Sequence, residues 1–119
     1  MNLKKADLII CLNLIEHLKD DYRLNFMQKI IPSILNRNGF VVFSLYKQYN
    51  FFNIVNMLFH RGCFFDPTHI YNWTEKQFEV EISKHFKIIK ILNVAGYTKL
   101  TSITKYAKTE TLIIAKLKK

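Results

Sequence analysis

The chain has 119 residues, half of them hydrophobic, and a formal net charge of +9. This length suits one globular domain with a real core, so we expect a single domain over residues 1–119. No apolar run approaches the roughly 20 residues of a membrane-spanning helix, and the first residues lack the apolar core of a signal peptide. The two cysteines, Cys11 and Cys63, have no partner at metal-ligand spacing, which indicates reduced thiols in a cytoplasmic protein.

The positive charge lies mainly in the last third of the sequence. Residues 82–119 contain nine lysines against one acid, Glu110, whereas residues 1–81 are nearly balanced. A basic segment of this kind can attract nucleic acid or an anionic membrane surface. Because these lysines are scattered rather than clustered, we favour a solvated surface and do not expect nucleic acid as a partner.

The apolar run from Asp7 to Leu12 predicts the first strand. It lacks polar alternation, which is typical of a strand buried on both faces in a parallel sheet. A helix is expected next, capped by Asp20 or Asp21. Pro32 removes a backbone donor from this helix, so we expect a kink or a break into a last short turn. The helix has two apolar rows: Tyr22, Phe26, Ile30 and Ile34, and beside them Met27, Ile31 and Leu35.

The second predicted strand is Phe40–Leu45, which follows a turn at Asn38 and Gly39. Two strands joined by an amphipathic helix make a right-handed crossover with parallel strands. The sequence therefore predicts the α/β class. The aromatic-rich segment after this strand favours a helix near residues 52–59, followed by a structured loop.

Another helix is expected to begin at Thr74, because Thr74 and Gln77 have the spacing of a capping box. Trp73 is expected to pack on Phe78. Residues 87–94 and 109–117 then predict a third and a fourth strand. The buried stripe of the helix is expected at every fourth residue: Phe78, Ile82 and Phe86.

Polar residues follow the first strand at its carboxyl end, where ligands of open α/β sheets bind. Asn13, Glu16 and His17 lie there. Glu16 and His17 can act as an acid and a base. Alternatively, Glu16 only favours the positive end of the next helix and His17 is an ordinary loop residue. A second polar group, Asp66 to His69, precedes the capped helix, and His69 either faces the same cleft or packs on nearby aromatic rings.

Taken in order, these segments resemble the C-terminal half of a class I S-adenosylmethionine-dependent methyltransferase, of the type that includes the ubiquinone O-methyltransferases. The match covers nearly the whole chain. It implies a partial Rossmann-like sheet of the family's strands 4-5-7-6, with the last strand antiparallel and with flanking helices. The fourth strand and its loop are resembled by ADLIICLNLIEHL, and the turn into the fifth strand is resembled by ILNRNGFVVFSLY. The loop before the last crossover helix is resembled by DPTHIYNWT. The sixth and seventh strands are resembled by HFKIIKI and TETLIIAKL.

The resemblance also implies residue roles around the cofactor S-adenosylmethionine (SAM). Cys11, Leu12 and Asn13 would line its methionine end. Glu16 and His17 would face the methyl acceptor, with His17 as the candidate base. Ubiquinone-type members have a glutamate at the position of Asn13 that helps to hold a divalent metal, so we expect no metal site here.

On the acceptor side, the resemblance makes Tyr46 and His69 candidate contacts. Residues 46–72 fall where such enzymes carry an acceptor-side insertion. Its aromatic content points to a small-molecule acceptor of an apolar, lipid-linked kind, with glycan-linked compounds as the other class considered; a hydrophobic lid on the sheet explains the same content equally well.

One part of the family pattern is missing. The only glycines are Gly39, Gly62 and Gly96, so the glycine-rich cofactor loop after the family's first strand is absent. We therefore expect a fragment, or one part of a split methyltransferase, that is inactive alone. Its first strand would have an open edge, which predicts as partner a missing N-terminal half or a second copy of the chain. Two alternatives remain open: a non-enzymatic basic interaction module, and a pseudoenzyme that dimerises through this edge.

Overall fold

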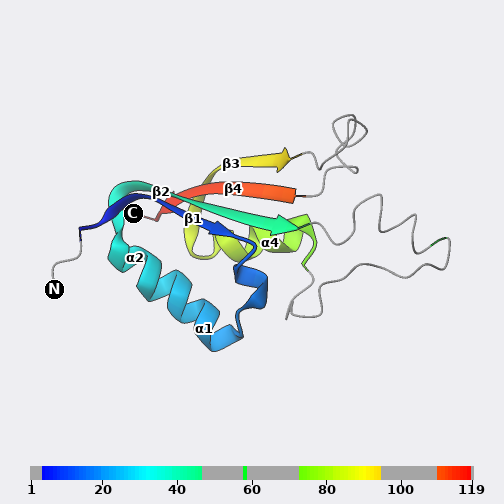
Figure 1. Ribbon diagram of the computed structural model, residues 1–119, viewed down its shortest axis with the longest axis horizontal. Helices are drawn as coiled ribbons and strands as arrows, with labels where there is room; N and C mark the ends of the chain where they lie inside the picture. Colours follow the sequence, from blue (N-terminus) through cyan, green and yellow to red (C-terminus); the bar gives the residue numbers. More distant parts are fainter. Residues whose placement is uncertain (1–3, 47–57, 59–72, 95–109, 119) are drawn as a thin grey trace.

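The computed structural model describes residues 4–46, 58, 73–94 and 110–118. A mixed four-stranded sheet in these residues has the order β1-β2-β4-β3 (Figure 1). β1 pairs in parallel with β2, and β4 lies antiparallel between β2 and β3. The predicted α/β sheet with an antiparallel last strand is confirmed. The strands are β1 (Ala6–Leu12), β2 (Leu35–Tyr46), β3 (Phe86–Val94) and β4 (Glu110–Leu117).

Helical segments lead from β1 to β2 and into β3. A short 3-10 turn, η1 (Ile15–His17), precedes a helical stretch made of α1 (Asp20–Asn25), a π-helical turn η2 (Phe26–Ile30) and α2 (Ile31–Ile34). α4 (Glu75–Ser83) precedes β3. No described helix is long and apolar enough to cross a membrane.

One hydrophobic core lies between these helices and one face of the sheet. Alternate residues of each strand point to this core, because strand side chains alternate between the two faces. The rings of Phe43 on β2 and Phe86 on β3 lie 5.4 Å apart within it. Fully buried helix residues meet fully buried sheet residues there: Met27, Ile31, Phe78 and Ile82 with Val41, Phe43, Ile113 and Ala115.

The opposite face of the sheet carries apolar side chains that the described residues leave open, and we call it the bare face. On β1, Leu8, Ile10 and Leu12 are 53, 59 and 60% exposed. β1 is the edge strand of the described sheet, and only its alternate residues reach the core. Within the described residues, the prediction that the first strand is buried on both faces is therefore wrong.

The first helix departs from its predicted pattern at its start. Its N-cap residue is Lys19, which makes no side-chain cap hydrogen bond. Asp20 is the first helical residue and forms an ion pair with Arg23 at 3.0 Å instead. The predicted aspartate cap is therefore wrong.

Only one of the two predicted apolar rows is fully buried, the row of Met27, Ile31 and Leu35. In the other row, Tyr22 is 68% exposed. Near the end of the helix, the turn before Pro32 is π-helical and is followed by the single turn of α2. Proline lacks a donor and crowds the preceding turn, and a π-helical turn accommodates both effects. The predicted break into a last short turn is thus observed.

Gly39 lies inside β2 and not in a turn before it. The register shifts here, since Ala6 pairs with Leu35 but Leu8 pairs with Phe40. A Cβ atom on Gly39 would lie 2.7 Å from Leu35 Cδ1 and 2.9 Å from the Asp7 carbonyl oxygen. The turn prediction is wrong, and glycine is needed because the backbone of β1 passes so close.

The capping box of α4 is confirmed in both directions. The Gln77 N–H donates to Thr74 Oγ1 at 3.2 Å, and the Thr74 N–H donates to Gln77 Oε1 at 2.9 Å. The rings of Trp73 and Phe78 lie 6.0 Å apart, as expected of a hydrophobic staple. The predicted helix near residues 52–59 and the loop after it lie outside the described residues, apart from Leu58.

Candidate functional site

The carboxyl end of β1 turns sharply at Asn13. This residue has a φ of 49°, in the left-handed region that asparagine tolerates better than most residues. The turn leads directly into η1. It therefore places Glu16 and His17 just beyond the end of the strand, at the edge of the sheet where α/β folds bind ligands.

Asn13 is fastened to the neighbouring strand by Ser44 of β2. The backbone N–H of Asn13 donates to Ser44 Oγ at 2.8 Å, and the Ser44 hydroxyl donates to Asn13 Oδ1 at 3.3 Å. Ser44 is 1% exposed and lies opposite Leu12 in the register of the two strands. Sequence reasoning missed this residue, although a lone hydroxyl in the apolar run FVVFSL was the signal that could have found it.

Glu16 and His17 differ in their access to solvent. Glu16 is 0% exposed, whereas His17 is half-buried. The backbone N–H of His17 donates to the Leu14 carbonyl at 3.0 Å, which closes the 3-10 turn. Of the two predicted catalytic side chains, only the imidazole of His17 presents surface to a ligand.

Cys11 and Leu12 point to opposite faces of the sheet. Cys11 is 4% exposed in the core, and burial raises the pKa of its thiol. The thiol is therefore neutral and shielded. Leu12 is 60% exposed on the bare face. Among the three residues assigned to the cofactor by resemblance, Leu12 and the half-buried Asn13 are accessible at the strand end, and Cys11 is not.

The predicted acceptor contacts lie largely outside the described residues. Tyr46 is the last residue of β2 and pairs with Glu110 of β4, but its side chain is not described. His69 falls in the undescribed range 59–72. Their roles stay predictions. In the described ranges, no group of three or more His, Cys, Asp or Glu side chains is placed to hold a metal ion.

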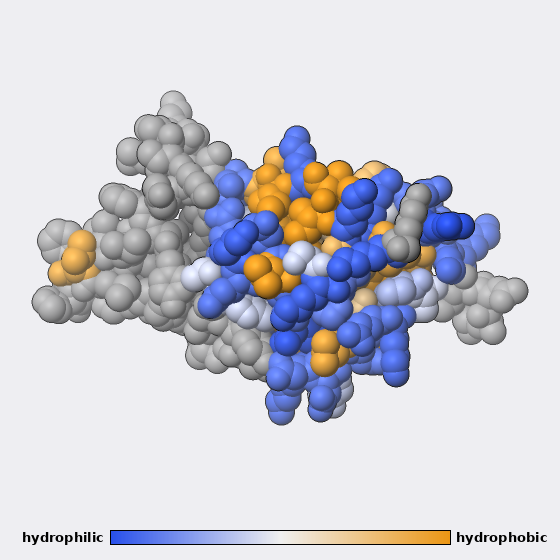
Figure 2. Space-filling model, turned by 180° about the vertical axis from the view of Figure 1, so that it is seen from behind, coloured by the Kyte–Doolittle hydropathy of each residue, from blue (hydrophilic) through white to orange (hydrophobic). Residues whose placement is uncertain are grey.

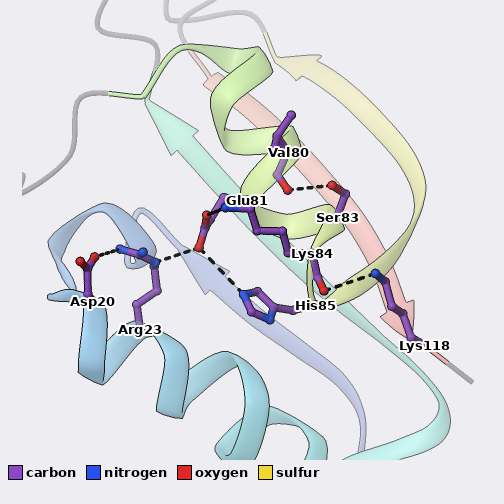
Figure 3. Close-up of polar contacts among 8 residues, drawn as sticks. All are labelled: Asp20, Arg23, Val80, Glu81, Ser83, Lys84, His85 and Lys118. Atoms are coloured by element: carbon purple, nitrogen blue, oxygen red, sulfur yellow. Dashed lines mark hydrogen bonds and ion pairs between the residues drawn. The ribbon is translucent and has the colours of Figure 1, made fainter.

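A second polar cluster joins α1 to α4, and sequence reasoning missed it (Figure 3). Arg23 Nε donates to Glu81 Oε1 at 3.0 Å, and both side chains are 10% exposed. Lys84 Nζ donates to Glu81 Oε2 at 3.0 Å, and His85 Nε2 lies 3.9 Å from Glu81 Oε1. The Arg23 guanidinium also lies over the Trp73 ring, 5.4 Å from its centroid.

The cluster sets the protonation of its members. Burial alone would raise the pKa of Glu81, but the hydrogen bond from Lys84 and the charges of Arg23 and Lys84 outweigh it, so this pKa is lowered. Burial is the main cause that lowers the pKa of His85, against the opposite effect of Glu81. Glu81 is thus a carboxylate and His85 a neutral imidazole near pH 7, which suits a cluster that holds two helices together.

No family model and no curated protein matches the sequence. Solved structures do share its fold. The small RNA methyltransferase HEN1 is 20% identical, with a TM-score of 0.67 over 97% of this chain and 14% of its own. A SAM-dependent methyltransferase from Archaeoglobus fulgidus is 15% identical, with a TM-score of 0.65 over 95% of this chain and 60% of its own. The N-methyltransferase NodS from Bradyrhizobium japonicum WM9, in complex with S-adenosyl-L-homocysteine (SAH), is 11% identical, with a TM-score of 0.55 over 100% of this chain and 50% of its own.

These likenesses fix the architecture. The chain spans at most 60% of the length of each of the three proteins. At identities of 20% or less, similarity in structure speaks for the fold. The chain has the mixed sheet with flanking helices that is found in SAM-dependent methyltransferases.

Proposed function

We propose that this chain is one half of a SAM-dependent methyltransferase domain and that it supplies the acceptor side of the active site. The observation that carries the proposal is the pair of hydrogen bonds between Asn13 and Ser44. They hold together the carboxyl ends of two parallel strands, at the edge where ligands of α/β folds bind. The methyltransferase fold of the structural neighbours supports the assignment.

The residues present fit part of a SAM site. Leu12 is exposed and Asn13 is half-buried at the end of β1, so both are available to the methionine end of the cofactor. The shielded thiol of Cys11 is not. The glycine-rich loop is missing from the 119 residues, so the remainder of the cofactor site has to come from other residues.

When bound, SAM supplies an electrophilic methyl group. The residues of this chain then have to orient the acceptor and exclude water, because methyl transfer is a direct displacement that depends on alignment. In our proposal His17 takes the proton that the acceptor loses, through its half-buried imidazole. Tyr46 and His69 contact a small-molecule acceptor of the lipid-linked or glycan-linked kind.

The bare face and the outer edge of β1 need a cover in this proposal. Apolar side chains at 53–60% exposure along an edge strand favour association. We infer that the cover is the rest of the methyltransferase domain, because the neighbours contain a part of their chains that has no counterpart here. A second copy of the chain is the competing occupant.

Calorimetry tests the cofactor part of the proposal. The 119-residue chain alone is expected to show no micromolar binding of SAM or SAH. Co-expression with a polypeptide that carries a strand and a glycine-rich loop, sought in the nucleotide sequence just upstream of Met1, is expected to produce such binding. Micromolar binding by the chain alone would overturn the proposal of a half site.

Two substitutions test the roles of the surfaces. In the completed enzyme, His17→Gln is expected to lower kcat by at least about 100-fold, whereas the matched substitution His85→Gln, outside the site, leaves kcat within about twofold.

In the chain alone, Ile10→Lys on the bare face is expected to reduce self-association in sedimentation experiments. Leu24→Lys on α1, at an exposed helix position, is the control. A discrete dimer of the unchanged chain that dissociates in Ile10→Lys but not in Leu24→Lys would favour the second copy instead.

A further inference from the structure

A basic hollow lies at the end of the sheet opposite to the one that carries the candidate site. It has a volume of about 570 Å³ and is lined by the start of β2, the start of β3 and the end of β4. Because β2 runs away from this end, the hollow is at the amino end of β2, whereas Ser44 and Asn13 are at the carboxyl end. The hollow is therefore separate from the proposed methyltransferase site. Its cationic lining residues are Arg37, Lys87, Lys116 and Lys118.

The described residues that line the hollow include no acidic side chain to balance its four positive charges. Apart from the four cations, they are Asn38, Ile89 and Leu117. Lys87 and Lys116 are directly opposite each other on β3 and β4. Like charges in this position destabilise a sheet, and a bound anion would relieve that repulsion.

Two of the four cations are positioned by contacts within the fold. Lys116 Nζ lies over the Phe40 ring, 4.5 Å from its centroid, and Lys118 Nζ donates to the Lys84 carbonyl at 3.3 Å. Arg37 and Lys87 are exposed. The hollow thus combines two positioned ammonium groups with two exposed cations that a ligand can reach.

Three of the lysines that are scattered in the sequence thus meet in one hollow with Arg37, and, contrary to the expectation from the sequence, we propose that this hollow binds the phosphate backbone of a single-stranded nucleic acid. A single phosphate on exposed lysines gains little affinity, because water and salt screen an exposed ion pair. A strand offers several phosphates in succession and releases a counterion at each one that is neutralised. A flexible strand can also adjust its backbone so that successive phosphates reach the four cations, whereas the phosphate spacing of a duplex is fixed.

The contact is with phosphates and not with bases. None of the described residues that line the hollow is aromatic, so the hollow itself offers no ring for a base to stack on. Binding should therefore show little preference among homopolymers and a strong dependence on salt. With four cations engaged, the slope of log affinity against log salt is expected to be about −3.

Fluorescence anisotropy with a labelled oligouridylate tests the proposal. Arg37→Gln with Lys87→Gln removes two cations from the hollow, and Lys19→Gln with Lys29→Gln removes two exposed cations from the helices, for the same change in net charge. The first pair is expected to weaken binding about tenfold and to reduce the salt slope by about 1.4. The second pair is expected to change both quantities much less. Thermal unfolding of both variants verifies that they fold.

Three results would overturn the proposal. Equal losses in the two double variants would mean that net charge alone drives binding. Micromolar binding of inorganic phosphate or uridine monophosphate would assign the hollow to a small anion. Binding to phosphatidylserine vesicles, but not to the oligonucleotide, would assign it to a membrane surface. SAM binding by the completed enzyme is expected to be the same in both variants, so this test and that of the proposed function fail independently.

Discussion

Arg23 on α1 and Glu81 on α4 form an ion pair of 3.0 Å between side chains that are each 10% exposed. The two residues are 58 positions apart in the sequence, and they join the helix of the first crossover to the helix that precedes β3. Figure 3 shows them reaching toward each other from the two helices. A buried pair of this kind makes the relative position of the helices sensitive to either charge.

Removal of one partner of this pair should be costly. Among the described residues, Arg23→Met leaves the shielded Glu81 with Lys84 and His85 as its charged or polar neighbours, so the free energy of unfolding is expected to fall by about 3 kcal/mol. The double variant Arg23→Met with Glu81→Met should lose clearly less than the sum of the two single variants. Urea denaturation measures all three.

The matched control is Asp20→Asn, which removes the exposed partner of Arg23. Its carboxylate is 66% exposed, so the loss should stay below about 1 kcal/mol. Single and double variants with strictly additive losses would show that Arg23 and Glu81 are not coupled.

His85 should make stability depend on pH below neutrality. Its pKa is lowered in the folded chain, chiefly by burial, so between that value and its usual value of about 6.5 the unfolded chain binds more protons. Stability is therefore full above about pH 6.5 and is lost as the pH falls through the lowered pKa. Between pH 7 and pH 5, Tm should fall less in His85→Gln than in the unchanged chain. His85→Asn, which likewise lacks a titratable side chain, should give the same result as His85→Gln.

Glu81 also makes stability fall as the pH falls, but in a lower pH range than His85. Its lowered pKa contributes stability above about pH 4.3, the usual value for a glutamate. That contribution is lost as the pH falls further through the lowered pKa. The free energy of unfolding should therefore depend less on pH between pH 5 and pH 3 in Glu81→Gln with Arg23→Gln than in the unchanged chain, as measured by urea denaturation at each pH. An equal pH dependence in the two proteins would contradict the role of the ion pair.

Gly39→Ala should destabilise the sheet through a steric clash. The added Cβ would meet the Asp7 carbonyl oxygen at 2.9 Å and Leu35 Cδ1 at 2.7 Å, and the first of these is backbone that cannot move aside easily. We expect a loss of about 1–3 kcal/mol in urea denaturation. Asn38→Ala, at the exposed neighbouring position, is the control and should cost less than about 1 kcal/mol.

Two substitutions of Asn13 should distinguish the contribution of its backbone conformation to stability from the contribution of its side chain. Asn13→Ala loses the Ser44 contact to Oδ1 and also places an alanine at a φ of 49°, whereas Asn13→Gly loses only the contact. The alanine variant should therefore be the less stable of the two by about 1 kcal/mol. Equal stabilities by thermal unfolding would mean that the left-handed turn relaxes in the alanine variant.

Local patterns predicted the elements of the fold well where one cause dominates. The capping box at Thr74 depends only on residues within one turn, and it is confirmed to the atom. The strand β1 was predicted, but the prediction of its burial on both faces was wrong, because a continuous apolar run does not tell which faces of the sheet are covered. Gly39 was misread as a turn residue, since a close approach between β1 and β2 is a property of their register.

The candidate site was predictable as a place in the fold but not in its details. The end of β1 was predicted from the stop of the apolar run before Glu16 and His17, yet their different burial depends on how η1 packs. The partner of Asn13 is Ser44, 31 positions later, and the partner of Arg23 is Glu81. Contacts across such separations are set by tertiary packing, which no local pattern contains.

The position of β4 has a consequence for how the sheet is made. β4 comes after β3 in the sequence but lies between β2 and β3, and it pairs with both. On the ribosome, β2 and β3 emerge first, and neither has its neighbour on that side until residues 110–117 have been synthesised. The described sheet therefore closes only after translation of its last strand, and until then the facing edges of β2 and β3 have no strand to pair with.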